Sequence, residues 1–186
     1  MTLQKNSIEV KLSDDKDAYI FKNLWPLYQH EFSEFDTSLV SNCHGLFGVD
    51  DSVKTLAEHS DLLSPYWKKT DSIFPYLIFV DGHPAGFNLV AARSILQDEI
   101  DADFVVHEFF VLHAYRGKGV AERGAIEGFN RHRGKWEIVT SPTNARAIAF
   151  WRRVVSNYIS NGYSEKEVDH VWGRKVAFNF DNTEKL

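Results

Sequence analysis

The stretch FFVLHAYRGKGVAERG, residues 109–124, contains the residues of this sequence most suited to chemistry. An apolar, strand-like run leads into a basic loop with two glycines and then into a predicted helix. Backbone N–H groups at a helix start, together with the helix dipole, attract phosphate. Gly117 and Gly119 allow phosphates to approach the backbone, while Arg116 and Lys118 add positive charge. The segment therefore predicts a pyrophosphate site, and the alternative is a solvated turn.

Two common phosphate motifs do not fit this loop. No GxxxxGK[ST] pattern is present, so a Walker A loop is excluded. The Rossmann pattern GxGxxG fails as well, because Glu122 stands where the third glycine belongs.

The loop resembles the signature of the GCN5-related N-acetyltransferase (GNAT) family, which is arginine or glutamine, two residues, glycine, one residue, then glycine or alanine. Residues 116–121, RGKGVA, fit every defined position. The family's second segment, an asparagine followed by a helix of the type A-x-x-F-Y, has its counterpart in residues 144–151, NARAIAFW. The resemblance covers about residues 73–151 and implies acetyl-CoA as cosubstrate, with no metal.

The resemblance also implies which residues contact the coenzyme. The strand before the loop would pair with the pantetheine arm, and the loop would bind the pyrophosphate. Asn144 would add a side-chain contact to the coenzyme, although a helix cap is an equal alternative for this residue. The predicted coenzyme-binding residues are Phe110, Val111, Leu112, Arg116, Gly117, Lys118, Gly119, Val120, Ala121 and Asn144.

Glu108 is the predicted general base. In a regular strand it shares a face with the apolar side chains of Val106 and Phe110, and burial raises the pKa of a carboxyl group toward the range useful for a base. Many family members carry a glutamate in this strand that takes a proton from the acceptor amine. A salt-bridged or edge-exposed glutamate is the alternative. His107 points the other way unless a bulge intervenes, so it is the second choice.

The general acid is less clear from the sequence. Trp151 stands where many family members have a tyrosine that protonates the leaving thiolate, and an indole N–H is too weak an acid for this role. Tyr158, two turns further along the same helix face, is the predicted substitute, with Tyr163 or water as alternatives.

Periodicity and turn residues predict a mixed α/β fold. The strongest hairpin signal joins two apolar runs through Asp81-Gly82-His83-Pro84. A helix with an apolar stripe of Ile20, Leu24, Leu27, Tyr28 and Phe32 begins near Ser13. We expect strands at 7–12, 73–80, 85–92, 103–112, 136–140, 163–171 and 174–180, and further helices at 52–59, 120–133 and 144–158. With the resemblance, this predicts a GNAT-like, mostly antiparallel sheet of about six to seven strands flanked by about four helices.

Length and composition predict one domain over residues 1–186, and we expect it in the cytoplasm. The chain has 186 residues, of which 44% are hydrophobic and 25% charged, which is typical of globular domains. It shows neither a signal peptide nor an apolar run long enough for a membrane. Cys43, the single cysteine, can form no internal disulfide and is expected to be a buried or idle thiol.

The net charge of −5 disfavours binding to nucleic acid. Acidic residues cluster at 31–61 and 98–103, which indicates either a solvated face or attraction of a cationic substrate. The sequence therefore predicts an N-acetyltransferase that acts on a primary amine of a small molecule or peptide. A homodimer is compatible with this prediction. The alternatives are a catalytically inactive acyl-CoA-binding module and a nucleotide site at the loop.

Overall fold

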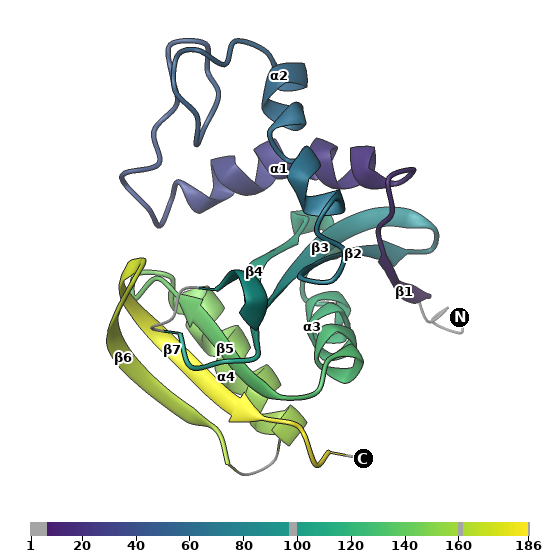
Figure 1. Cartoon of the computed structure of the whole chain (residues 1–186), viewed down its shortest axis with the longest axis vertical. Coiled ribbons are helices and arrows are strands. Elements are labelled where there is room, and N and C mark those ends of the chain that lie inside the picture. The colour runs from purple at the N-terminus through teal and green to yellow at the C-terminus, as the bar shows by residue number, and fades with distance from the viewer. Residues whose placement is uncertain (1–6, 97–99, 160–161, 186) are drawn as a thin grey trace.

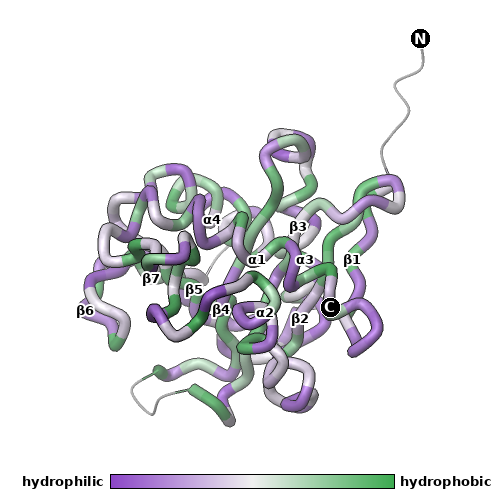
Figure 2. The backbone as a smooth tube through the Cα atoms, turned by 90° about the horizontal axis from the view of Figure 1, so that it is seen from above, coloured by the Kyte–Doolittle hydropathy of each residue, from purple (hydrophilic) through white to green (hydrophobic). Residues whose placement is uncertain are grey.

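The computed structural model describes residues 7–96, 100–159 and 162–185 and shows a seven-stranded sheet in the order β1-β2-β3-β4-β5-β7-β6 (Figure 1). Seen from above, the sheet runs from β6 at one side of the molecule to β1 at the other (Figure 2). Among the strands in these described ranges, only β4 and β5 are parallel neighbours. The elements are β1 Ile8–Leu12, α1 Ala18–Phe32, α2 Leu56–Asp61, β2 Ile73–Val80, β3 His83–Ala92, β4 Phe104–Val111, α3 Val120–Arg131, β5 Lys135–Thr140, α4 Ala145–Ile159, β6 Ser164–His170 and β7 Gly173–Asp181.

This architecture confirms the predicted fold class. Each expected strand and helix is present, with ends that differ by a few residues. The turn between β2 and β3 is shorter than predicted, since Asp81 and Gly82 alone form it with φ values of 50° and 78°. Two consecutive positive φ values are typical of a type I′ hairpin, so His83 and Pro84 already belong to β3. No helix in the described ranges is long and apolar enough to cross a membrane.

Helices cover both faces of the sheet. Helix α1 packs on one face, where Phe21, Leu24 and Trp25 join side chains of β2 and β3 in a core. The predicted stripe on α1 was wrong in part, because Leu27 is 52% exposed and Trp25 takes its place. Helix α1 also begins later than predicted, at Ala18.

Helices α3 and α4 pack on the other face in a second core. The two glycines of α3 allow this helix to lie very close to the sheet. A Cβ atom at Gly124 would be 2.3 Å from Ile78 Cδ1, and one at Gly128 would be 2.6 Å from Asn88 Nδ2. The close approach expected from their spacing is therefore present, and it sets α3 tightly against β2 and β3.

Strand β4 changes its pairing in the middle. Its pairing with β3 shifts register at His107, because Leu89 pairs with Glu108 whereas Val90 pairs with Val106. This is a β-bulge, in which one extra residue bends the strand and increases its twist. The parallel pairing with β5 ends at the same place, since Val106 with Ile138 is the last of three pairs. Beyond the bulge, β4 and β5 diverge.

We expect Gly86→Ala to destabilise the protein by about 3 kcal/mol or more. A Cβ atom at this position of β3 would lie 2.1 Å from the Phe110 carbonyl oxygen and 2.9 Å from Val111 Cα, and backbone cannot rotate away as a side chain can. Gly82→Ala is the control, because it meets nothing within 4 Å and suffers only from its positive φ. Urea unfolding of both variants measures the difference; a Gly86→Ala variant as stable as Gly82→Ala would contradict the close packing of β3 on β4.

Candidate active site

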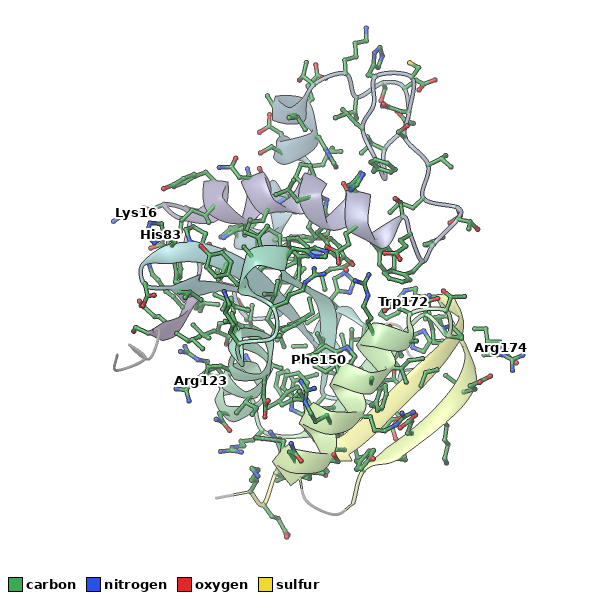
Figure 3. The ribbon with its side chains drawn as sticks, turned by 180° about the vertical axis from the view of Figure 1, so that it is seen from behind. Lys16, His83, Arg123, Phe150, Trp172 and Arg174 are labelled. Atoms are coloured by element: carbon green, nitrogen blue, oxygen red, sulfur yellow. The ribbon has the colours of Figure 1, made fainter. Side chains whose placement is uncertain are left out.

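A cleft of about 820 Å³ lies where β4 and β5 diverge. Its walls come from the second half of α1, the starts of α3 and α4, and the turn between β6 and β7. Two of its aromatic side chains are marked in Figure 3: Phe150 on α4 and Trp172 at the β6–β7 turn. The basic loop, α1 and the β6–β7 hairpin thus border the cleft.

The edge of β4 toward β5 is free beyond the bulge. The Leu112 N–H donates to the Ala85 carbonyl on β3, and alternation along an antiparallel pair turns the polar groups of Val111 and Phe109 the other way. Arg116 Nε donates to the Val111 carbonyl oxygen at 2.7 Å. The backbone N–H groups of Phe109 and Val111 are left facing the opening. An extended ligand arm can therefore pair with this edge through Phe109 and Val111, whereas the resemblance implied residues 110–112.

The loop of residues 116–121 forms a cradle of backbone N–H groups. Gly117 and Gly119 adopt φ values of 72° and 77°, and Gly119 is the N-cap residue of α3. Within the described ranges, none of the backbone N–H groups of residues 117–122 has a hydrogen-bond partner. Gly117, Gly119, Ala121 and Glu122 line the cleft. This arrangement fits a pyrophosphate.

The two basic side chains of the loop are occupied by the chain itself. Arg116 forms a two-pronged ion pair with Glu31 of α1, with nitrogen-to-oxygen distances of 2.6 and 2.7 Å. Lys118 Nζ donates to the Ala114 carbonyl oxygen at 2.9 Å. The loop therefore offers a ligand mainly its backbone N–H groups, and Arg116 ties the loop to α1.

Asn144 lies at the cleft and caps α4. Its Oδ1 accepts a hydrogen bond from the Ala147 N–H at 2.9 Å. The capping alternative is thus present in the structure. The side-chain Nδ2 has no partner within the described residues, so a contact with a ligand is compatible with the cap.

Glu108 faces α1 because of the bulge. The bulge at His107 reverses the alternation, so the prediction that Glu108 shares a face with Val106 was wrong: Val106 belongs to the core under α3 and α4, whereas Phe110 belongs to the core under α1. The hydroxyl group of Tyr28 donates a hydrogen bond to Glu108 Oε2. Burial raises the pKa of Glu108 to about 7, although the Tyr28 hydrogen bond and the positive charge of Lys175 oppose this rise.

Several residues of the cleft were not identified from the sequence. Tyr28 was assigned to the apolar stripe of α1, and Phe32 with it. Trp172 and Lys175 come from the β6–β7 hairpin and line the cleft close to His107, whose ring contacts the Trp172 ring at 5.8 Å between centroids. Desolvation lowers the pKa of His107. No local pattern marks these residues, because tertiary folding brings them to the cleft.

The tyrosine expected as general acid lies elsewhere. Tyr158 is buried in the core beside Phe129, and its hydroxyl donates to Asn130 Oδ1 at 3.0 Å. Neither Tyr158 nor Tyr163 lines the cleft, so their placement argues against a catalytic role. Trp151 lines the cleft but packs against Phe109 at 5.1 Å between ring centroids, as its apolar position predicted.

Most of the clustered acidic residues have partners within the chain. Glu34 pairs with Arg146, and Glu58 forms the capping box of α2 with Thr55. Asp98 and Glu99 lie outside the described residues. Cys43 is exposed, contrary to a buried thiol, and its hydrogen bond with Asp51 raises its pKa, which suits an idle thiol. The described residues include no group of three or more potential metal ligands.

Comparison with known proteins agrees with this geometry. The family model described as acetyltransferase (GNAT) family matches residues 40–155. No curated protein sequence matches the chain. Similar solved structures include aminoglycoside acetyltransferase AAC(6')-Ib in complex with coenzyme A and kanamycin, at 19% identity, 94% coverage of this chain, 95% coverage of that chain and a TM-score of 0.63.

Two further similar structures come from Thermus thermophilus and Thermoplasma acidophilum. An acetyltransferase from Thermus thermophilus is 14% identical, with 96% and 99% of the two chains covered and a TM-score of 0.62. PaiA N-acetyltransferase from Thermoplasma acidophilum in complex with coenzyme A is 13% identical, with 94% and 99% covered and a TM-score of 0.60. At these identities the structures support the fold, while the family model covers more than half of the chain.

We expect Gly119→Glu to abolish binding of acetyl-CoA in a folded protein. The substitution brings a carboxylate to a cradle suited to phosphate and strains a residue at φ 77°. Gly45→Glu is the control, because Gly45 has a similar φ of 82°, has open space around it and does not line the cleft. Calorimetric titration measures both affinities, and unchanged affinity in folded Gly119→Glu would remove the loop from the site.

We also expect Glu108→Gln to be more stable than the wild type at alkaline pH. The folded-state pKa of about 7 lies above the ordinary value of 4.5, so ionised Glu108 costs stability once the pH rises through this window. The advantage of the variant should grow between pH 4.5 and pH 8 by up to about 3 kcal/mol, since one pKa unit corresponds to about 1.4 kcal/mol. Urea unfolding at both pH values tests this, and a pH-independent difference would contradict the raised pKa.

Proposed function

Because this chain belongs to the GNAT family of acetyltransferases, we propose that it transfers the acetyl group of acetyl-CoA to a primary amine, with Glu108 as the general base. The observation that carries this proposal is a carboxyl group with a pKa of about 7 in the cleft, on the strand whose free edge adjoins the N–H cradle. A base whose pKa lies near the working pH is the most efficient one.

The coenzyme would be held by this chain's backbone. The N–H groups of residues 117–122 would bind the pyrophosphate, and the free edge of β4 would align the pantetheine arm. The N–H groups of Phe109 and Val111 face the opening and could donate to the thioester oxygen as it gains negative charge. Acetyl-CoA supplies the activated acyl group.

The bonds and the proton of the acetyl transfer can be accounted for with Glu108 as the one catalytic base. The amine nitrogen attacks the thioester carbonyl carbon and forms the new C–N bond, Glu108 accepts the proton lost from nitrogen, and the C–S bond breaks. A thiol has an ordinary pKa of about 8.5, so its thiolate can leave near neutral pH without an acid and take a proton from water. A tyrosine at the position of Trp151 is therefore not essential for turnover.

The acceptor is proposed to be a small molecule or peptide that enters beside α1 and the β6–β7 turn. Aromatic side chains of Phe32, Phe35 and Trp172 line this part of the cleft. Its charges are mixed, because Asp36 and Glu108 accompany Lys175. A cationic acceptor has weaker support than the sequence indicated, since Glu31 and Glu34 are already paired with arginines.

We expect Glu108→Gln to lower kcat/KM for the amine by about 10²- to 10⁴-fold, the usual contribution of a positioned base. The Kd for acetyl-CoA should barely change, and the acidic limb of the pH profile should vanish. The measurement is the release of free thiol from acetyl-CoA in the presence of an amine. The amines tested are polyamines, aminoglycosides, amino acids and lysine peptides. Glu9→Gln on the exposed edge strand β1 is the matched control.

Four outcomes would contradict the proposal. Wild-type kcat/KM in Glu108→Gln across pH 6 to 9 would show that His107 or water is the base. Weaker coenzyme binding in the variant would give Glu108 a structural role in β4. Binding of acetyl-CoA without thiol release for any amine would favour the inactive acyl-CoA-binding module, and displacement of the coenzyme by ATP would favour a nucleotide site.

A further inference from the structure

A tyrosine from α1 is bonded to the proposed base across 80 residues of sequence. The Tyr28 hydroxyl group donates to Glu108 Oε2, and both side chains line the cleft. Glu108 Oε1 has no hydrogen-bond partner in the part of the chain that the structure describes. One carboxylate oxygen is thus held while the other is available to accept a proton.

We propose that Tyr28 is a positioning residue for Glu108, which keeps the carboxylate anionic and leaves Oε1 to receive the proton of the acceptor amine. This inference rests on the proposed function, in which Glu108 is the base. Tyr28 acts through Glu108 and forms no bond with the reacting atoms.

The backbone arrangement makes this contact possible. Without the bulge at His107, Glu108 would face the core under α3 and α4, away from α1. With the bulge, Glu108 turns to the face that α1 covers, in the pair with Leu89 of β3. Two features distant in sequence, a bulge in β4 and a tyrosine on α1, are therefore needed together.

The Tyr28 ring is held in place by aromatic neighbours. It stacks on Phe32 at 5.7 Å, meets Phe87 in an edge contact at 5.6 Å and lies tilted against Phe110 at 5.9 Å between centroids. Rotation of the ring away from Glu108 would disturb these contacts. The hydroxyl group is thus preorganised, and the carboxylate does not have to recruit a donor from water.

The electrostatic surroundings favour this direction of donation. Burial and the charge of Glu108 raise the pKa of Tyr28 well above 10, so its hydroxyl stays a donor throughout the useful pH range. The other groups around Glu108 are Lys175 of β7, His107 of β4, Asp36 after α1 and Tyr66 of the 3₁₀ turn Ser64–Trp67. Lys175 opposes the burial effect from a distance, whereas Tyr28 does so by direct contact.

Tyr28→Phe tests the inference, because it removes the hydroxyl group and keeps the ring. We expect kcat/KM at pH 6 to fall by about tenfold, the factor for one lost charge-assisted hydrogen bond, and the acidic limb of the profile to move to higher pH. At high pH the rate should approach that of the wild type, with the Kd for acetyl-CoA unchanged. Tyr66→Phe is the control, since Tyr66 lies nearby and makes no hydrogen bond to Glu108.

A second measurement separates this inference from the proposed function. ¹³C NMR titration of the glutamate carboxyl groups, with the Glu108 signal identified by its loss in Glu108→Gln, reports the ionisation of Glu108 without any acceptor. The midpoint should rise from about 7 in Tyr28→Phe and stay in place in Tyr66→Phe. This result would support the Tyr28 contact even if no amine is acetylated.

The double variant Tyr28→Phe/Glu108→Gln completes the test. If Tyr28 acts through Glu108, removing the hydroxyl group should cost nothing further in rate once the carboxylate is absent. An equal loss in both backgrounds, a pH-independent loss in Tyr28→Phe, or an unchanged NMR midpoint would each overturn the inference.

Discussion

The separation of β4 from β5 is the constraint on which the rest of the site depends. The two parallel strands are pinned at their starts, where the Asp103 N–H donates to the Lys135 carbonyl oxygen at 2.8 Å and the Lys135 N–H donates to Asp103 Oδ2 at 2.8 Å. Pairing then continues for three residue pairs and stops at Val106, immediately before the bulge. A bulge bends its strand and increases the twist, so a parallel neighbour can no longer follow. The free edge, the cleft and the orientation of Glu108 all follow from this one irregularity.

Helix α1 closes the cleft and connects its two ends. One turn of this helix carries Tyr28, which contacts Glu108, and Glu31, which holds Arg116. Because Arg116 also donates to the Val111 carbonyl oxygen, the ion pair joins α1, the end of β4 and the basic loop. An ion pair between partly buried side chains adds little to the stability of the fold, so its main effect is to hold these elements in place relative to one another. The position of α1 therefore links the basic loop to the residues around Glu108.

The elements of the fold could be predicted because their signals are local. The hairpin turn requires two positive φ values that Asp81 and Gly82 supply, and the glycines of the basic loop leave its backbone accessible. The bulge could not be predicted in this way, because DFVVHEFFVL reads as a regular strand and only its partner β3 fixes the register. The same holds for Tyr28, whose apolar ring fits the core of α1 while its hydroxyl group finds a partner on β4.

A carboxyl group with a pKa near 7 costs stability in this cleft, and the proposed role of Glu108 as base would require that cost. Burial among aromatic rings raises the pKa of Glu108 and penalises its anion, yet a base must be anionic to accept a proton. One hydrogen bond from Tyr28 and a more distant charge on Lys175 offset part of this penalty and leave Oε1 unoccupied. Two donors on the carboxylate would lower its basicity further, whereas none would leave it protonated at neutral pH. A single donor on a rigid ring keeps the carboxyl group between these limits.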